Sequence, residues 1–110
     1  NYLKYYEVGR LGWLKEIGFS YKKLEEEDII LPVVRTNIVF RKPAFFDDEL
    51  VIKTDLIKHP SYSIEFQYNI YKKKQLINEG YTKLVFLNKK TKKLIKCPKK
   101  IQEAIINWKS

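Results

Sequence analysis

The sequence has little of the chemistry that metal centres and redox sites use. Its 110 residues include one cysteine, Cys97, one histidine, His59, and no methionine. A single cysteine cannot form a disulfide within the chain, and one cysteine with one histidine cannot assemble a zinc site from these two ligand types. We therefore expect no metal. Cys97 precedes Pro98 and follows a run of lysines, where a buried or incidental thiol is expected rather than a nucleophile.

Long apolar runs are also missing from the sequence. None approaches the roughly 20 residues that a membrane-spanning helix requires. The first residues lack the basic and then apolar pattern of a signal peptide, so a cytoplasmic location with no integral membrane segment is expected. Hydrophobic residues nevertheless make up 45% of the chain and aromatic residues 15%, which excludes a disordered protein. A chain of this length fits one domain with a modest core, which an oligomer would enlarge.

Acidic residues are outnumbered, with 13 Asp and Glu against 22 Lys and Arg and a formal net charge of +9. Such a charge is typical either of nucleic-acid or anion binding, or of a solvated surface in a proteome that favours lysine. Lys, Ile, Asn and Tyr are all abundant, as AT-rich codons would supply, and lysines fall in turns at residues 72–74 and 89–90. We favour the solvated surface.

Residues 2–17 predict a long helix, because the stretch contains no proline and its apolar residues recur at helical spacing. The positions expected to form one buried face are Leu3, Tyr6, Leu11, Leu14 and Ile17. Apolar residues on other sides predict a helix that is largely enclosed. Gly18 would end this helix, and Ser20 would cap a short second helix that reaches Glu27.

After Ile29 the hydrophobic period changes from helical to alternating, which predicts strands. The first has about ten residues and is closed by Pro43, and others follow at about residues 49–58, 62–70 and 76–87, with a short one at 94–95. Gly80 indicates a bulge or a close approach, and Pro98 would open a final amphipathic helix. One long helix followed by antiparallel strands predicts an α+β domain, in which a twisted sheet wraps the helix and leaves an exposed edge strand.

Several segments together resemble a known family. Residues 1–10, which read NYLKYYEVGR, resemble the central helix of the hotdog-fold thioesterases, which begins Asn-Tyr and carries an acidic residue and an arginine at these spacings. Residues 31–34, 41–48 and 79–80 resemble the start of that family's next strand, its shared bend and the start of its fourth strand. The resemblance is to the 4-hydroxybenzoyl-CoA thioesterase family, in particular to the small bacterial acyl-CoA thioesterases of the YbgC-like branch.

The resemblance implies one hotdog domain over residues 1–110, an antiparallel β-sheet wrapped around a long central α-helix. It also implies an acyl-CoA thioesterase that hydrolyses the thioester to free acid and coenzyme A, without a cofactor, as a homodimer or a homotetramer built as a dimer of dimers. The family's first strand and its catalytic loop, with the main catalytic aspartate, would lie before residue 1. Two alternatives stay open: a hotdog protein acting on acyl-acyl carrier protein and, more remotely, a basic nucleic-acid-binding module.

Two residues are candidates for catalysis, because thioester hydrolysis needs a carboxylate and donors for the developing oxyanion. The resemblance implies that Glu7 contacts the substrate or orients the site, whereas the alternative is a surface ion pair with Arg10 at i,i+3. Asn1 would lie at the N-terminal end of the helix, where backbone N–H groups and the helix dipole favour an oxyanion. The alternative for Asn1 is an N-cap, and both roles can coexist.

Other residues are candidates for binding. Those expected to contact the acyl group, and otherwise to be core residues, are Tyr2, Tyr6, Val33, Val34 and Thr36. Those expected to bind coenzyme A, and otherwise to be solvated, are Arg41, Lys42, Ser61, Tyr62 and Ser63. A lysine-rich rim would also attract the phosphates of coenzyme A. Asp47 and Asp48 are expected to fix their bend, and His59 to lie on the surface.

Overall fold

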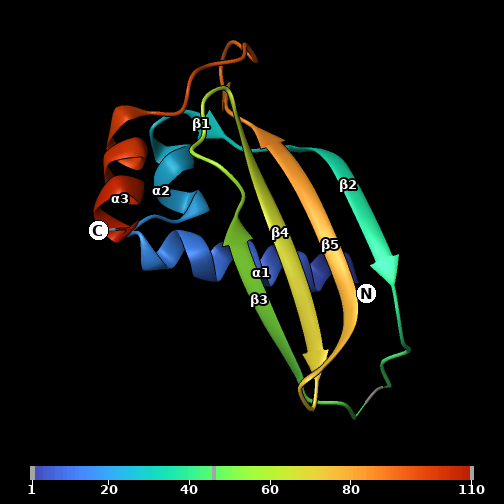
Figure 1. Cartoon of the computed structure of the whole chain (residues 1–110). Helices are drawn as coiled ribbons and strands as arrows, with labels where there is room; N and C mark the ends of the chain where they lie inside the picture. Colours follow the sequence, from blue (N-terminus) through green and yellow to red (C-terminus); the bar gives the residue numbers. More distant parts are fainter. Residues whose placement is uncertain (1, 46, 110) are drawn as a thin grey trace.

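The computed structural model describes residues 2–45 and 47–109. The elements in chain order are α1 (Tyr2–Glu16), α2 (Tyr21–Glu26), β1 (Ile29–Ile30), β2 (Val33–Phe40), β3 (Leu50–Leu56), β4 (Ser63–Lys72), β5 (Gln75–Val85), β6 (Leu87–Asn88) and α3 (Lys99–Lys109). The long helix α1 crosses one face of the main sheet, and α2 and α3 lie near the C-terminal end of α1 (Figure 1). None of the helices described is long and apolar enough to cross a membrane.

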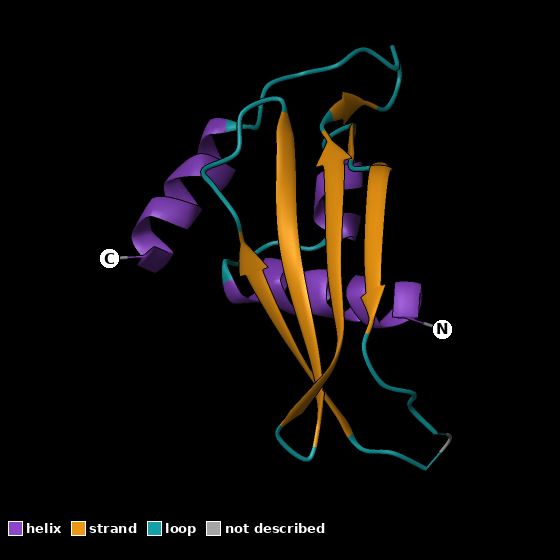
Figure 2. Cartoon of the chain, turned by 45° about the vertical axis from the view of Figure 1, so that its right-hand side comes forward, coloured by secondary structure: helices purple, strands orange, loops and turns teal. Residues whose placement is uncertain are grey.

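The main sheet has four antiparallel strands in the order β2-β5-β4-β3, which leaves β2 and β3 at the edges (Figure 2). A separate two-stranded sheet pairs β1 with β6. The first predicted strand is divided into β1 and β2 around Pro32, which has no N–H to donate to a ladder. The strand expected at residues 94–95 is reduced to one bridge, between Leu87 and Leu94. The other predicted strands and the α+β class are confirmed.

The signals for the helix ends are confirmed. Gly18 follows α1 with a φ of +88°, a conformation that glycine adopts without steric cost. The Ser20 hydroxyl accepts a hydrogen bond from the Lys23 N–H at 3.2 Å and so caps α2. These two residues fix the turn that brings α2 back beside α1.

The predicted buried face of α1 is wrong in part. Leu3 and Leu11 are 50% and 41% exposed, whereas Arg10 is only 7% exposed and Trp13 only 3%. The helix carries apolar residues on several sides, so the sequence supports more than one buried face. The face of α1 that packs against the sheet carries Tyr6, Arg10 and Trp13, whose rings and guanidinium contact side chains of the sheet. The helix is also not enclosed within this chain, because Val8 is exposed as well.

Gly80 allows a close approach and does not form the bulge. A Cβ at this position would overlap the ring of Tyr6, so only glycine lets α1 lie this near β5. The bulge lies at Ile77 instead, since Asn78 pairs with Ile70 whereas Leu76 pairs with Tyr71.

The core contains two chemically different groups of residues. The first, which we call the polar cluster, comprises Tyr6, Arg10, Tyr68, Asn78 and Thr82. The second, the apolar cluster, comprises Leu24, Ile64, Phe86, Cys97, Ile101 and Ile105. Burial raises the pKa of the Cys97 thiol to about 12, so the expected buried and unreactive thiol is confirmed.

Candidate functional site

A pocket of about 320 Å³ opens where α1, α2 and β1 meet. Its lining residues are Glu7, Arg10, Tyr21, Glu25, Ile29, Ile30, Leu31 and Pro32. We call it the Arg10 pocket. Its wall at residues 29–32 is apolar, and its polar groups come from the two helices. A concave, largely apolar site with a few convergent polar groups is the usual form of a small-molecule site.

Arg10 holds the elements around this pocket together. Its Nε donates to the Tyr21 hydroxyl at 3.2 Å, and a terminal nitrogen donates to the Tyr68 hydroxyl at 3.1 Å. The Tyr68 hydroxyl lies 2.6 Å from the Thr82 Oγ1. Burial alone would lower the pKa of Arg10, but its hydrogen bonds to Tyr68 and Tyr21 outweigh this and raise the pKa above its ordinary value. The guanidinium therefore stays charged inside the fold.

Glu7 lines the same pocket but does not pair with Arg10. Within residues 2–45 and 47–109, no hydrogen bond or ion pair engages the Glu7 carboxylate, which lies one helical turn before Arg10. The surface ion pair considered as the alternative is therefore not formed, because Arg10 turns inward to two tyrosines. The carboxylate is exposed and able to accept a hydrogen bond from a ligand or a water molecule.

A second pocket, of about 430 Å³, lies at the start of α1 and the end of β2. Its lining residues are Tyr2, Phe40, Arg41, Lys42, Pro43 and Ala44. The rings of Tyr2 and Phe40 meet edge to face at 5.4 Å. The positive end of the α1 dipole and two basic side chains favour negative charge here, although Arg41 is also paired with Glu79. Asn1 lies outside the residues that the structure describes, so its predicted role stays a prediction.

The residues predicted to contact an acyl group do not gather around one pocket. Tyr2 lines the second pocket, whereas Tyr6 is fully buried and donates to the Asn78 side-chain oxygen. Burial raises the pKa of Tyr6 to about 12. Val33 and Val34 are exposed on the edge strand β2, and the half-buried Thr36 pairs with Thr82 of β5. Within a single chain, Tyr6 is thus a core residue, and Val33, Val34 and Thr36 line neither pocket.

The residues predicted to bind coenzyme A lie in two separate places. Arg41 and Lys42 follow Phe40, which pairs with Asn78, whereas the segment 61–63 ends beside Val85. Asn78 and Val85 are seven residues apart on β5, a distance of roughly 23 Å along an extended strand. Ser61 and Ser63 are also bonded to each other through their backbones, and Tyr62 is exposed. One chain therefore does not bring these two groups to the same phosphate.

Asp48 has the structural role that was predicted for it. Its carboxylate accepts the Phe45 N–H and lies 3.1 Å from the Lys72 Nζ. The backbone hydrogen bond from Phe45, followed by the contact with Lys72, lowers the pKa of Asp48. Asp47 is exposed in the same bend, and His59 is exposed, as expected, near the Gln102 side chain.

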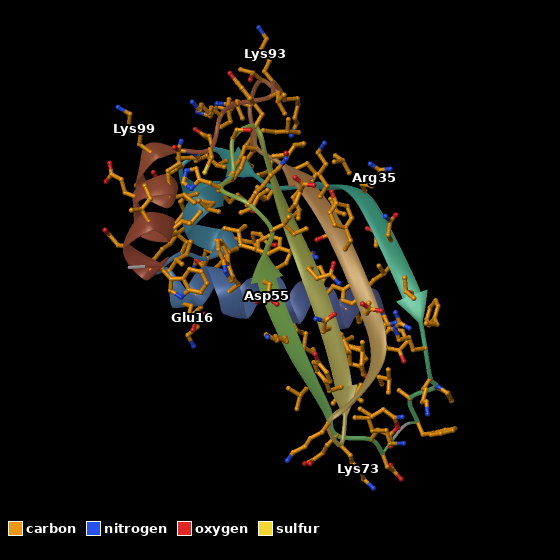
Figure 3. The ribbon with its side chains drawn as sticks, in the orientation of Figure 1. Glu16, Arg35, Asp55, Lys73, Lys93 and Lys99 are labelled. Atoms are coloured by element: carbon orange, nitrogen blue, oxygen red, sulfur yellow. The ribbon has the colours of Figure 1, made fainter. Side chains whose placement is uncertain are left out.

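The positive charge is spread over the surface rather than collected in one place. Lys73 lies at one end of the molecule, and Lys93 and Lys99 lie at the other (Figure 3). The face of the sheet that points away from α1 carries acids as well, because Glu65 accepts from the Tyr81 hydroxyl and pairs with Lys58. This mixture disfavours a nucleic-acid surface, which needs a continuous basic patch.

Sequence reasoning missed the inward position of Arg10 and its tyrosine partners. Arg10 was considered only as a partner for Glu7. Its spacing from Tyr6 and Trp13, four residues after one and three before the other, places all three on one helical face and was the available signal. Neither Tyr21 nor Tyr68 could be linked to Arg10 without the fold.

A sequence model of the family described as the thioesterase-like superfamily matches residues 1–105. A protein of Bacillus subtilis (strain 168), provisionally named acyl-CoA thioesterase YneP, is 34% identical over 71 residues. That alignment covers 64% of this chain and 51% of the relative, so it spans about half the length of that protein.

Solved structures of two thioesterases are closely similar. The DHNA-CoA thioesterase from Staphylococcus aureus superposes with a TM-score of 0.92 at 29% identity, over 99% of this chain and 76% of that one. The BH1999 gentisyl-coenzyme A thioesterase gives a TM-score of 0.86 at 25% identity, over 97% of this chain and 84% of that one. The hotdog fold predicted from the sequence is thereby confirmed.

Proposed function

This chain belongs to the thioesterase-like superfamily, and from that premise we propose that it hydrolyses the thioester of acyl-CoA to a free acid and coenzyme A. The coenzyme A thioesters named for both structural relatives and for the Bacillus subtilis relative support this substrate class. The observation that carries the proposal is the Glu7 carboxylate, which borders a pocket on the central helix without a hydrogen-bond or ion-pair partner among the described residues. The neighbouring Glu25 is engaged by Lys89 at 2.9 Å.

In the proposed reaction a water oxygen adds to the thioester carbonyl carbon while a carboxylate accepts the water proton. The tetrahedral intermediate collapses, the C–S bond breaks, and the thiolate of coenzyme A leaves and takes up a proton. Glu7 orients or activates the water, a contribution typically worth 10²–10⁴ in rate. Glu7 would act together with the main catalytic aspartate that the family resemblance implies.

The start of α1 is the proposed site for the oxyanion. A helix N-terminus stabilises developing negative charge, and α1 begins at Tyr2. Glu7 lies five residues further on, roughly 7.5 Å along the helix axis. Arg41 and Lys42, which line the pocket at this end, would attract the phosphates of coenzyme A.

A homodimer formed through β2 would complete the site. This edge strand has no internal proline and only one charged residue, Arg35, and it exposes 55% of Val34 and 67% of Phe40. Unprotected edge strands pair readily with a second copy, and antiparallel pairing of identical strands gives a closed two-fold dimer. Val33, Val34 and Thr36 would then meet the partner subunit. Segment 61–63 of one chain would bind coenzyme A at a site formed with another chain. A dimer of dimers would give a tetramer.

The cellular setting follows from the substrate class. Acyl-CoA is a cytoplasmic metabolite, and the organisms named for the relatives are bacteria, which supports a bacterial cytoplasmic enzyme.

The test is release of free thiol from short, long and aromatic acyl-CoAs, with the same acyl groups on acyl carrier protein for comparison. The assay uses the full-length natural protein. Glu7→Gln should lower kcat by about 100-fold or more, because the amide cannot accept the water proton. Glu16→Gln, at an exposed acid on the same helix, is the control and should stay within about twofold. Turnover on no acyl-CoA, or an unchanged rate in Glu7→Gln, would contradict the proposal.

A further inference from the structure

The charge on Arg10 has no carboxylate to balance it. The described residues form six ion pairs, and Arg10 takes part in none of them. Its partners are the neutral hydroxyls of Tyr21 and Tyr68. Every other Arg and Lys in residues 2–45 and 47–108 has a side chain more exposed than that of Arg10, so water can solvate their charges. Arg10 is therefore a cation held inside the fold without a counter-ion among the residues that the structure describes.

A buried charge is costly unless it is paired and hydrogen-bonded. The guanidinium of arginine has five N–H donors arranged to bind a carboxylate through two parallel bonds. The hydrogen bonds to Tyr21 and Tyr68 use Nε and one terminal nitrogen of Arg10, which leaves donor capacity on the terminal nitrogens. Because Arg10 also lines the pocket, this capacity is available where a ligand would lie.

The rest of the pocket indicates what kind of ligand would fit. Residues 29–32 supply an apolar wall opposite the charge. Glu25 is neutralised by Lys89, so it contributes little repulsion. Glu7 is exposed, and water screens its charge more effectively than that of the buried Arg10. A ligand with an apolar body and one carboxylate matches this arrangement.

We propose that the Arg10 pocket binds a carboxylate carried on an apolar body, with Arg10 as the residue that selects it. The inference deepens the proposed thioesterase function and rests on it for the substrate class: acyl-CoAs whose acyl group ends in a free carboxylate. The same chemistry is also present in the released acid, so the experiment separates these two sources. Tyr68 is a positioning residue, because it is fully buried and holds the guanidinium from behind, whereas Tyr21 holds it and also lines the pocket.

The first arm measures binding without turnover. Benzoate and its neutral isostere benzamide are titrated into the protein and followed by NMR or calorimetry. Benzoate should bind about tenfold more tightly than benzamide, and Arg10→Gln should abolish that difference. Arg10→Lys keeps the charge but loses the two-bond geometry, so it should retain part of the preference. Glu7→Gln removes a neighbouring negative charge and should tighten benzoate binding about twofold or more while leaving benzamide unchanged.

Arg10→Gln should remove the preference for benzoate, whereas Glu7→Gln should tighten benzoate binding. These opposite effects separate recognition of charge from a role in folding. If Arg10→Gln does not fold, Arg10→Lys and Glu7→Gln still decide the matter. Equal binding of benzoate and benzamide by the unaltered protein, or no tightening in Glu7→Gln, would overturn the proposal.

The second arm compares turnover of glutaryl-CoA and pentanoyl-CoA, which have equal chain length with and without a terminal carboxylate. A kcat/KM about tenfold higher for glutaryl-CoA, lost in Arg10→Gln, assigns the pocket to the acyl terminus. If benzoate binding depends on Arg10 but glutaryl-CoA is not preferred over pentanoyl-CoA, the pocket is assigned to the released acid. If pentanoyl-CoA is hydrolysed but there is neither a preference for glutaryl-CoA nor Arg10-dependent benzoate binding, the inference is overturned and the proposed function stands. If benzoate binding depends on Arg10 but no acyl-CoA is hydrolysed, the carboxylate site stands and the proposed function is overturned.

Discussion

The polar and apolar clusters of the core differ in their chemistry. The apolar cluster consists of aliphatic and aromatic side chains and one thiol, and it includes residues of α2, β4 and α3. The polar cluster lies between α1 and the sheet, where the Tyr6 and Tyr68 rings stack at 4.6 Å and their hydroxyls bond to Asn78, Arg10 and Thr82.

The two clusters would serve different purposes. A core that needs only stability is built most simply from apolar side chains, because buried polar groups lose hydration and regain it only through well-placed partners. The polar cluster accepts this cost, and the side-chain nitrogen of Asn78 has no partner among the described residues. Its member Arg10 is also the one that lines a pocket. We infer that the apolar cluster holds the fold together and the polar cluster shapes the site.

The largest expected effect on stability is in the apolar cluster. Ile105→Ala would leave a cavity beneath α3 and should lower the free energy of unfolding by about 2–5 kcal/mol. Thiol release well below the unfolding temperature should be unchanged. Urea denaturation measures the free energy of unfolding. Ile106→Ala, at a neighbouring position that is 57% exposed, should change this free energy by less than about 0.5 kcal/mol. A loss of activity in folded Ile105→Ala protein would break the division between the clusters.

A slightly smaller effect is expected where α1 approaches β5. Gly80→Ala places a methyl group into the Tyr6 ring and should cost about 1–3 kcal/mol. Because Tyr6 must move away from Asn78 and Tyr68, activity should fall as well. Gly12→Ala is the control, since a Cβ there meets nothing, and it should raise the unfolding free energy by up to about 1 kcal/mol. Equal thermal stability of the two variants would show that the close approach is not required.

How far the sequence predicted these features depends on the range of the interactions. Alternation and turn residues located the strands, and Gly18 and Ser20 located the helix ends, because those signals are local. The buried face of α1 was ambiguous, since Leu3 and Leu11 are as apolar as Trp13. The separation of Arg41 from Ser63 depends on their register against β5, which no local pattern contains. Arg10 was missed for the same reason, because its partner Tyr68 lies 58 residues away.

The polar cluster can be tested without creating a cavity. Tyr68→Phe removes the one hydroxyl that joins Arg10 to Thr82 and should cost about 1–3 kcal/mol, because a buried donor and a buried acceptor lose a partner. It should also lower the rate of thiol release, since Arg10 is no longer held. Tyr71→Phe, on the outer face of the same strand, is the matched control for both measurements. Normal kinetics in Tyr68→Phe would mean that the cluster serves stability alone.

The smallest effect is expected far from both clusters. Lys73 and Lys74 form the turn between β4 and β5 with positive φ angles of 48° and 68°. Lys74→Gly should relieve this conformation and stabilise the protein by up to about 1 kcal/mol, with no change in kinetics. Lys96→Gly, at an exposed position without a positive φ, should give no such gain. A kinetic change in Lys74→Gly would show that activity responds to stability in general rather than to the polar cluster.

The most direct measurement is thiol release from acyl-CoA by Glu7→Gln and Ile105→Ala side by side, with the unfolding free energy of each. We predict that Glu7→Gln keeps its stability and loses about 100-fold or more in kcat, whereas Ile105→Ala loses stability and keeps its kcat. The reverse pattern, or a rate that simply follows stability in both variants, would contradict the separation of the proposed catalytic residue Glu7 from the apolar cluster that stabilises the fold.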